Sequence, residues 1–162
     1  MEQTITVGIS DIKVAKDGDI LVTYALGSCV GICLYDSVMR VAGLSHIMLP
    51  SSIQFEARDV QKYKFADTAI ECLIRRMEEM GANRRRMKAK IAGGAQMFAA
   101  SNGSSLANIG ARNVEAVKAE LRRLAIPILA EDTGKDYGRT QFLYSADGRM
   151  RITSVNRGEW VY

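Results

Sequence analysis

Residues 30–49 read VGICLYDSVMRVAGLSHIML, and this stretch decides the fold. Two apolar runs, 30–35 and 38–49, flank the turn-forming pair Asp36-Ser37, a pattern typical of a β-hairpin. Both faces of this hairpin are largely apolar. We therefore expect the sheet that contains it to be covered on both sides.

The segments around this hairpin predict an α/β (α+β) fold in one domain that spans residues 1–162. Upstream, alternating apolar residues over 12–14 and 20–24 flank Asp17-Gly18 and predict another hairpin. Downstream, the expected elements are a helix over 63–77 that ends near Gly81, a strand over 88–92, a helix over 113–124 with Asn113 as its N-cap, and strands over 128–130, 140–144 and 149–155.

Composition excludes several classes of site. The chain has a single histidine, His46, so zinc sites with three histidines and iron sites with two are excluded. Its three cysteines, Cys29, Cys33 and Cys72, are an odd number without CxxC spacing, which argues against a disulfide framework and a four-cysteine zinc site. We expect free thiols, no metal and no cofactor. With no secretory signal and no apolar stretch of about 20 residues, a cytoplasmic location is the expectation.

Positive charge is concentrated in one segment. The net charge is +4, and residues 75–90 hold seven basic and two acidic side chains. Such a run, densest over 84–90, can contact nucleic acid or an acidic membrane, but it is also typical of a solvated helix end and loop. No nucleic-acid-binding motif accompanies it. We favour the solvated helix end, and expect no nucleic acid partner and no direct membrane insertion.

One cysteine and the histidine are candidates for chemistry. A two-residue turn at Asp36-Ser37 would place Gly27 opposite His46, which makes Cys29 and His46 diagonal neighbours on one face of the hairpin. Cys33 would lie on that face too, but four residues further along, and should be inert. A buried free thiol beside a core histidine is the alternative interpretation.

A thiol beside an imidazole has a defined chemistry. A neighbouring imidazolium lowers the pKa of a thiol and makes it a nucleophile. The same imidazole can then protonate a leaving amine and deprotonate water. Backbone N–H groups of Ser28 and Cys29, at the bend before the hairpin, could stabilise an oxyanion.

Several stretches together resemble the CheD family of chemoreceptor glutamine deamidases. Residues 23–36, TYALGSCVGICLYD, resemble its LGSCVxVxLYD segment, and residues 43–50, GLSHIMLP, its G-x-x-H-x-M-L-P segment. Further matches are 90–98 (KIAGGAQMF), 109–113 (IGARN), and Gly138-Arg139 followed by Phe142. The resemblance spans nearly the whole chain, in order. One departure is Lys135, where the family pattern leads us to expect a second glycine.

The resemblance implies specific roles. They are a nucleophile at Cys29, a general acid and base at His46, and a supporting threonine at Thr23. It implies a layered α/β/β sandwich, similar to the catalytic domain of cytotoxic necrotizing factors, and a protein-glutamine glutaminase that acts on the cytoplasmic helices of chemoreceptors. It also implies a CheC-type phosphatase as partner, and we expect the free chain to be a monomer.

Two other functions remain open. The chain could be mainly a binding module that regulates the CheC-type phosphatase, with little deamidase activity. A cysteine peptidase would share the acylation chemistry, but a site that admits only a glutamine side chain from a rigid helix argues against general proteolysis.

Overall fold

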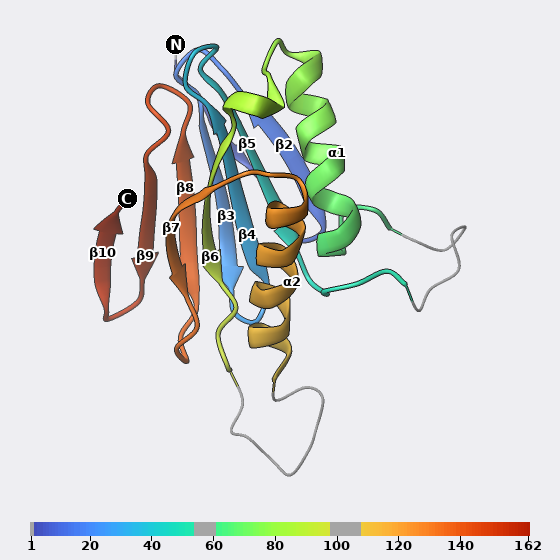
Figure 1. Ribbon diagram of the computed structural model, residues 1–162. Coiled ribbons are helices and arrows are strands. Elements are labelled where there is room, and N and C mark those ends of the chain that lie inside the picture. The colour runs from blue at the N-terminus through green and yellow to red at the C-terminus, as the bar shows by residue number, and fades with distance from the viewer. Residues whose placement is uncertain (1, 54–60, 98–107) are drawn as a thin grey trace.

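Two five-stranded sheets and two helices form three layers in the computed structural model, which describes residues 2–53, 61–97 and 108–162 (Figure 1). One sheet comprises, in spatial order, β1 (Thr4–Thr6), β3 (Ile20–Leu26), β8 (Arg139–Tyr144), β9 (Met150–Ser154) and β10 (Gly158–Val161). The other comprises β2 (Asp11–Ala15), β5 (Val41–Ile47), β4 (Val30–Asp36), β6 (Lys88–Gly93) and β7 (Ile128–Thr133). The helices α1 (Ala66–Glu79) and α2 (Ile109–Arg123) cover the second sheet on the side away from the first (Figure 1).

This arrangement confirms the expected α+β layering. Every residue of β5 is buried, because the strand has helices on one face and the other sheet on the opposite face. The similarity to cytotoxic necrotizing factors and the single-domain assignment stay predictions. Among the described residues, no helix is long and apolar enough to cross a membrane.

The central hairpin is confirmed, but its register was wrong. The turn has four residues, 37–40, so Asp36 lies opposite Val41 and Gly31 lies opposite His46. The Asp36 carboxylate accepts hydrogen bonds from the N–H groups of Val38 and Met39, which closes this longer turn. The shift is an even number of residues, so each side chain keeps its predicted face.

The predicted N-terminal hairpin is wrong. β2 pairs with β5, and β3 pairs with β1 and β8, so the two strands belong to different sheets. Asp17 and Gly18 do form a turn, with φ values of 59° and 89°, but this turn carries the chain from one sheet to the other. Alternating strands around a turn signal look the same whether they pair or cross between layers.

The helices follow the apolar pattern, but both begin at other residues than expected, and α1 begins three residues later, at Ala66. α1 ends where predicted, and Gly81 follows it with a φ of 98°. α2 begins four residues earlier than expected, with Asn108 at its N-cap position, so Asn113 is not a cap. Asn113 is instead fully buried, one turn before Val117 on the same face. The short edge strands β1 and β10 were not predicted.

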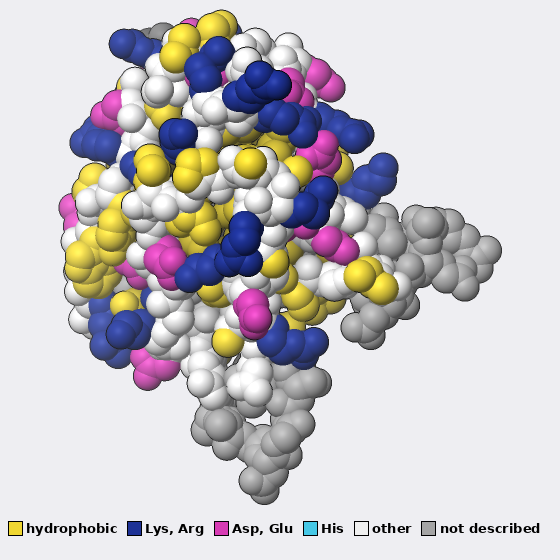
Figure 2. All heavy atoms as spheres, in the orientation of Figure 1, with side chains coloured by type: hydrophobic (Ala, Val, Ile, Leu, Met, Phe, Trp, Pro, Cys, Tyr) yellow, Lys and Arg dark blue, Asp and Glu magenta, His cyan; other side chains and the backbone are white. Residues whose placement is uncertain are grey.

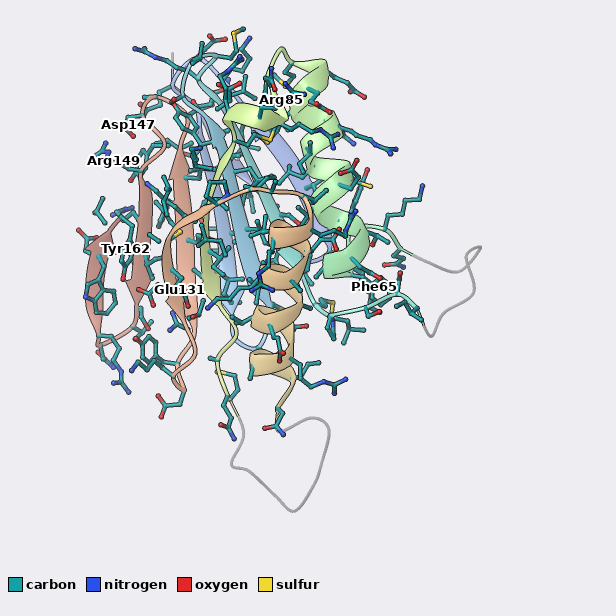
Figure 3. The ribbon with its side chains drawn as sticks, viewed as in Figure 1. Phe65, Arg85, Glu131, Asp147, Arg149 and Tyr162 are labelled. Carbon is teal, nitrogen blue, oxygen red and sulfur yellow. The ribbon has the colours of Figure 1, made fainter. Side chains whose placement is uncertain are left out.

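Part of the basic segment forms ion pairs within the molecule. Within the short helix η2 (Arg84–Arg86), Arg84 pairs with Glu71 and Glu78 of α1, and Arg86 pairs with Asp36. Figure 3 labels Arg85, whose side chain is exposed at this end of the molecule. The segment is therefore a helix end and its connection, as the sequence indicated.

Candidate active site

His46 and Thr23 meet between the two sheets. Both side chains are fully buried, and the Thr23 hydroxyl lies 2.6 Å from His46 Nδ1 and 2.7 Å from the Val7 carbonyl oxygen. The hydroxyl has one hydrogen, which it donates to the carbonyl of Val7. Thr23 must then accept the hydrogen of Nδ1, so Nε2 carries the lone pair of a neutral imidazole.

The free nitrogen of His46 is the atom that a general base needs. Nε2 is buried and has no hydrogen-bond partner among the residues that the structure describes. On the face shown in Figure 2, no histidine surface is visible, in agreement with its full burial. A reacting group must therefore approach this nitrogen from within the site.

Cys29 lies one residue before β4, at the end of the sandwich. Gly31 lies opposite His46, and Cys29, two residues before Gly31, packs against the core between the sheets, on the side where His46 meets Thr23. The strand before it, β3, contains a bulge between Thr23 and Leu26, where Ala25 has a φ of 58°. A bulge bends its strand and redirects the chain, here from one sheet toward the other. No hydrogen bond joins the Cys29 thiol to the imidazole in the described part of the chain.

The bend before β4, residues 27–29, is fixed by hydrogen bonds that its carbonyl groups accept. Ala95 N–H donates to Gly27 O, and Gly94 N–H donates to Cys29 O, both at 2.8 Å. The glycines at the end of β6 permit this approach, because a Cβ on Gly93 would lie 2.2 Å from the Cys29 carbonyl oxygen. The third carbonyl of the bend, that of Ser28, accepts a hydrogen bond from Asn113 at 3.0 Å.

Burial changes the protonation expected from the sequence. Burial lowers the pKa of His46 from its ordinary 6.5 to about 4. Burial also raises the pKa of the Cys29 thiol, and a hydrogen bond from its own backbone lowers it by less. Both shifts favour a neutral imidazole and a protonated thiol in the resting site, in contrast to the imidazolium and activated thiol that the sequence led us to expect.

The other cysteines lie outside this arrangement. Cys33 is buried on the inter-sheet face, and burial strongly raises the pKa of its thiol. Cys72 is half-buried in α1 and packs against the helix-side core. Over residues 2–53, 61–97 and 108–162, no group of three or more His, Cys, Asp or Glu side chains could hold a metal ion.

Three contacts of the site were not predicted. The Val7 carbonyl fixes the Thr23 hydroxyl, but a backbone acceptor has no sequence signal. Asn113 gave a signal, because an asparagine on the apolar face of a helix must find buried partners. Lys135, the departure from the family pattern, has a φ of 63°, which a glycine adopts easily. Its carbonyl accepts a hydrogen bond from Gln96, so this loop lies beside the Gly94 loop.

Comparison with known proteins shows the family of the chain. Residues 48–154 match the family model described as CheD chemotactic sensory transduction. A probable chemoreceptor glutamine deamidase CheD from Caldanaerobacter subterraneus is 53% identical over 95% of this chain and 94% of its own. The chemoreceptor glutamine deamidase CheD of Halalkalibacterium halodurans is 46% identical over 98% of both chains. A probable deamidase of the same name from Clostridium botulinum is 48% identical over 95% of this chain and 94% of its own. The chain therefore belongs to the CheD family.

Proposed function

We propose that this chain hydrolyses selected glutamine side chains of chemoreceptors to glutamate, with Cys29 as nucleophile and His46 as general base and acid. The observation that carries the proposal is the buried imidazole, whose Nδ1 is anchored by Thr23 and whose Nε2 is free on the face that Cys29 shares. The relatives named as chemoreceptor glutamine deamidases supply the substrate class. The enzyme acts in the cytoplasm, where a free thiol stays reduced.

The reaction starts from two neutral groups. As the Cys29 sulfur bonds to the side-chain amide carbon, His46 Nε2 takes the thiol proton, and the amide oxygen becomes an oxyanion. Backbone N–H groups of Ser28 and Cys29 stabilise that oxyanion. His46 then gives its proton to the leaving nitrogen, the C–N bond breaks, and ammonia leaves a thioester behind.

Hydrolysis of the thioester completes the cycle. His46 takes a proton from a water molecule whose oxygen adds to the thioester carbon. The C–S bond then breaks, glutamate is released, and the proton returns to the sulfur. Thr23 keeps Nε2 directed at the reacting atoms throughout, as the third member of a catalytic triad does.

Intact-mass measurement of a chemoreceptor fragment tests the proposal. The wild-type chain should add the small mass that accompanies replacement of NH2 by OH, without cleaving the fragment. Cys29→Ser and His46→Ala should abolish this change. Cys72→Ser, which alters a thiol outside the site, should retain it. Cleavage products would indicate a peptidase, and full activity of His46→Ala would exclude the mechanism.

A CheC-type phosphatase is the protein partner that we propose, on the basis of the family resemblance. Exposed apolar side chains on the segments that carry or adjoin the site residues offer a surface for it. Tyr24, Met48 and Met97 are 53%, 37% and 45% exposed. Tyr24 adjoins Thr23 in sequence, Met48 follows β5, and Met97 lies over Gly27. Exposed methionine and tyrosine side chains suit a docking surface that adapts to its partner.

The same apolar surface must also admit a receptor helix, so the two ligands should compete. A titration of deamidation rate against the phosphatase measures this competition. The rate should fall as binding saturates, and Cys29→Ser should still bind the phosphatase, because docking does not need the nucleophile. A constant rate at saturation would show that the two surfaces are separate.

A further inference from the structure

We infer that Asn113 of α2 is a positioning residue that fixes the direction of the Cys29 backbone N–H, an inference that rests on the proposed function. Its side chain is fully buried. Nδ2 donates to the carbonyl oxygen of Ser28 at 3.0 Å and to that of Met48 at 2.9 Å. One amide group thus ties the residue before the nucleophile to the end of the strand that carries His46.

Asn113 acts where the β4–β5 ladder ends. The last paired residues are Val30 and Ile47, and Ser28 and Met48 lie just beyond them. Without ladder partners, their carbonyl groups would have to find other donors or water. Asn113 supplies both hydrogen bonds from the adjacent helix layer, and so extends the fixed geometry of the strands to the catalytic bend.

The effect on the oxyanion site follows from the geometry of a peptide unit. The carbonyl of Ser28 and the N–H of Cys29 belong to one planar trans unit, so they point in opposite directions. Because the carbonyl points at Asn113 in α2, the N–H points away from α2. A hydrogen bond on the carbonyl also polarises the N–H, which strengthens it as a donor to a developing oxyanion.

Packing alone does not account for an amide at this position. Val117, one turn later on the same face, is also fully buried and fills its space with apolar atoms. The first turn of α2 is also pressed onto the loop beside the nucleophile. A Cβ on Gly110 would lie 2.3 Å from the Ala95 carbonyl oxygen. The helix therefore presents Asn113 to the bend from a fixed position.

Kinetics of Asn113→Ala and Asn113→Asp, with Val117→Ala as the matched control, test the inference. Losing one oxyanion donor lowers kcat about 100-fold or more, and we expect a loss of that size with little change in KM. Alkylation of Cys29 by iodoacetamide forms no oxyanion, so its rate should stay near the wild-type value in both variants. Val117→Ala should lose thermal stability but keep kcat. Asn113→Asp preserves the shape of the side chain and carries the test if the alanine variant does not fold.

Three results distinguish a failure of this inference from a failure of the proposed function. A kcat of Asn113→Ala equal to that of Val117→Ala would overturn the inference and leave the proposed function intact. A parallel fall of kcat and Cys29 alkylation would also overturn it, because Asn113 would then act on the thiol or on His46. Wild-type protein as inactive as Cys29→Ser would instead reject the proposed function.

Discussion

Neutral His46 makes a prediction about the pH dependence of the reaction. Burial holds the pKa of His46 at about 4, so this proposed base is unprotonated throughout the neutral range. The acid limb of kcat/KM reports the pKa of the essential base in the free enzyme. We expect kcat/KM to stay level as pH falls from about 7 to about 5, and to decline only near 4. A midpoint near 6.5, the pKa of a solvated histidine, would contradict this picture.

A second prediction concerns the hydrogen bond between Thr23 and His46. Thr23→Val keeps the shape of the side chain but leaves the Nδ1 hydrogen of His46 without its acceptor. We expect kcat to fall about 10- to 100-fold, by analogy with the loss of a group that orients a metal-bound histidine. Thr23→Ser restores the hydroxyl and should recover most of the activity. A larger loss in Thr23→Ser than in Thr23→Val would show that methyl packing, and not the hydrogen bond, is what matters.

Residue types indicated the proposed reacting groups but not their protonation. The sequence contains a single histidine, and the expected hairpin brings it close to a cysteine. The family resemblance adds Thr23. The pKa values depend on burial, however, and burial of His46 comes from β3 of the other sheet. Nothing in residues 30–49 indicates which element covers that face, so the neutral resting pair could not be predicted.

At the scale of the elements, the close approach of the two sheets depends on Gly31. A Cβ on Gly31 would lie 1.7 Å from Gln141 Oε1 and 3.2 Å from Leu26 Cδ1. Gln141 donates to the Gly31 carbonyl oxygen at 3.1 Å, so it has little room to move. We expect Gly31→Ala to lower the free energy of unfolding by about 1–3 kcal/mol, as overpacking does.

A double-mutant cycle identifies the cause. Adding Gln141→Ala to Gly31→Ala removes the clashing atoms. In urea denaturation, the double variant should therefore lose less unfolding free energy than the two single variants lose in sum, by about 0.5–3 kcal/mol. Gly8→Ala is the matched control, because a Cβ at Gly8 would meet nothing within 4 Å. Strict additivity of Gly31→Ala and Gln141→Ala would contradict the steric explanation.

Elements were predicted well where a local residue pattern specifies them. They were predicted poorly where they depend on which strands pair. The central hairpin and the C-terminal ends of both helices follow from apolar periodicity and from Gly81 or Pro127. The false hairpin at Asp17-Gly18 shows the limit, because a turn signal does not reveal whether its strands pair. The four-residue turn at 37–40 depends on hydrogen bonds to Asp36, which the pattern of apolar residues does not show.

For the whole molecule, one buried carboxylate connects three parts of the fold. Asp36 ends β4, and it accepts hydrogen bonds from the turn at Val38 and Met39, from the Asn83 N–H, and from Arg86 of η2. The side chain is fully buried, whereas Arg86 is partly exposed. The hairpin is thereby fixed to the connection between α1 and β6. Glu131 of β7, labelled in Figure 3, makes a comparable but exposed link to Lys118 of α2 at 2.8 Å.

The acid stability of the molecule should reflect this carboxylate. Burial alone would raise the pKa of Asp36, but Arg86 and the three backbone N–H groups lower it to about 2. The unfolded chain binds the proton near pH 4, so the stabilisation is complete above about pH 4 and is lost as pH falls toward 2. Asp36→Asn should lose about 3 kcal/mol of unfolding free energy at neutral pH, the scale of breaking a buried ion pair.

The comparison across pH distinguishes this linkage from a simple loss of packing. Denaturation of wild type and Asp36→Asn at successive pH values should show their difference shrinking between about pH 4 and about pH 2, because only the wild type has this carboxylate to protonate. The control is Asp147→Asn, which removes the exposed pair with Arg149 labelled in Figure 3. An exposed pair contributes about 0–1 kcal/mol, so this variant should follow the wild type at every pH. A difference between wild type and Asp36→Asn that stays constant down to pH 2 would mean that Asp36 stabilises the fold through its shape and not through its charge.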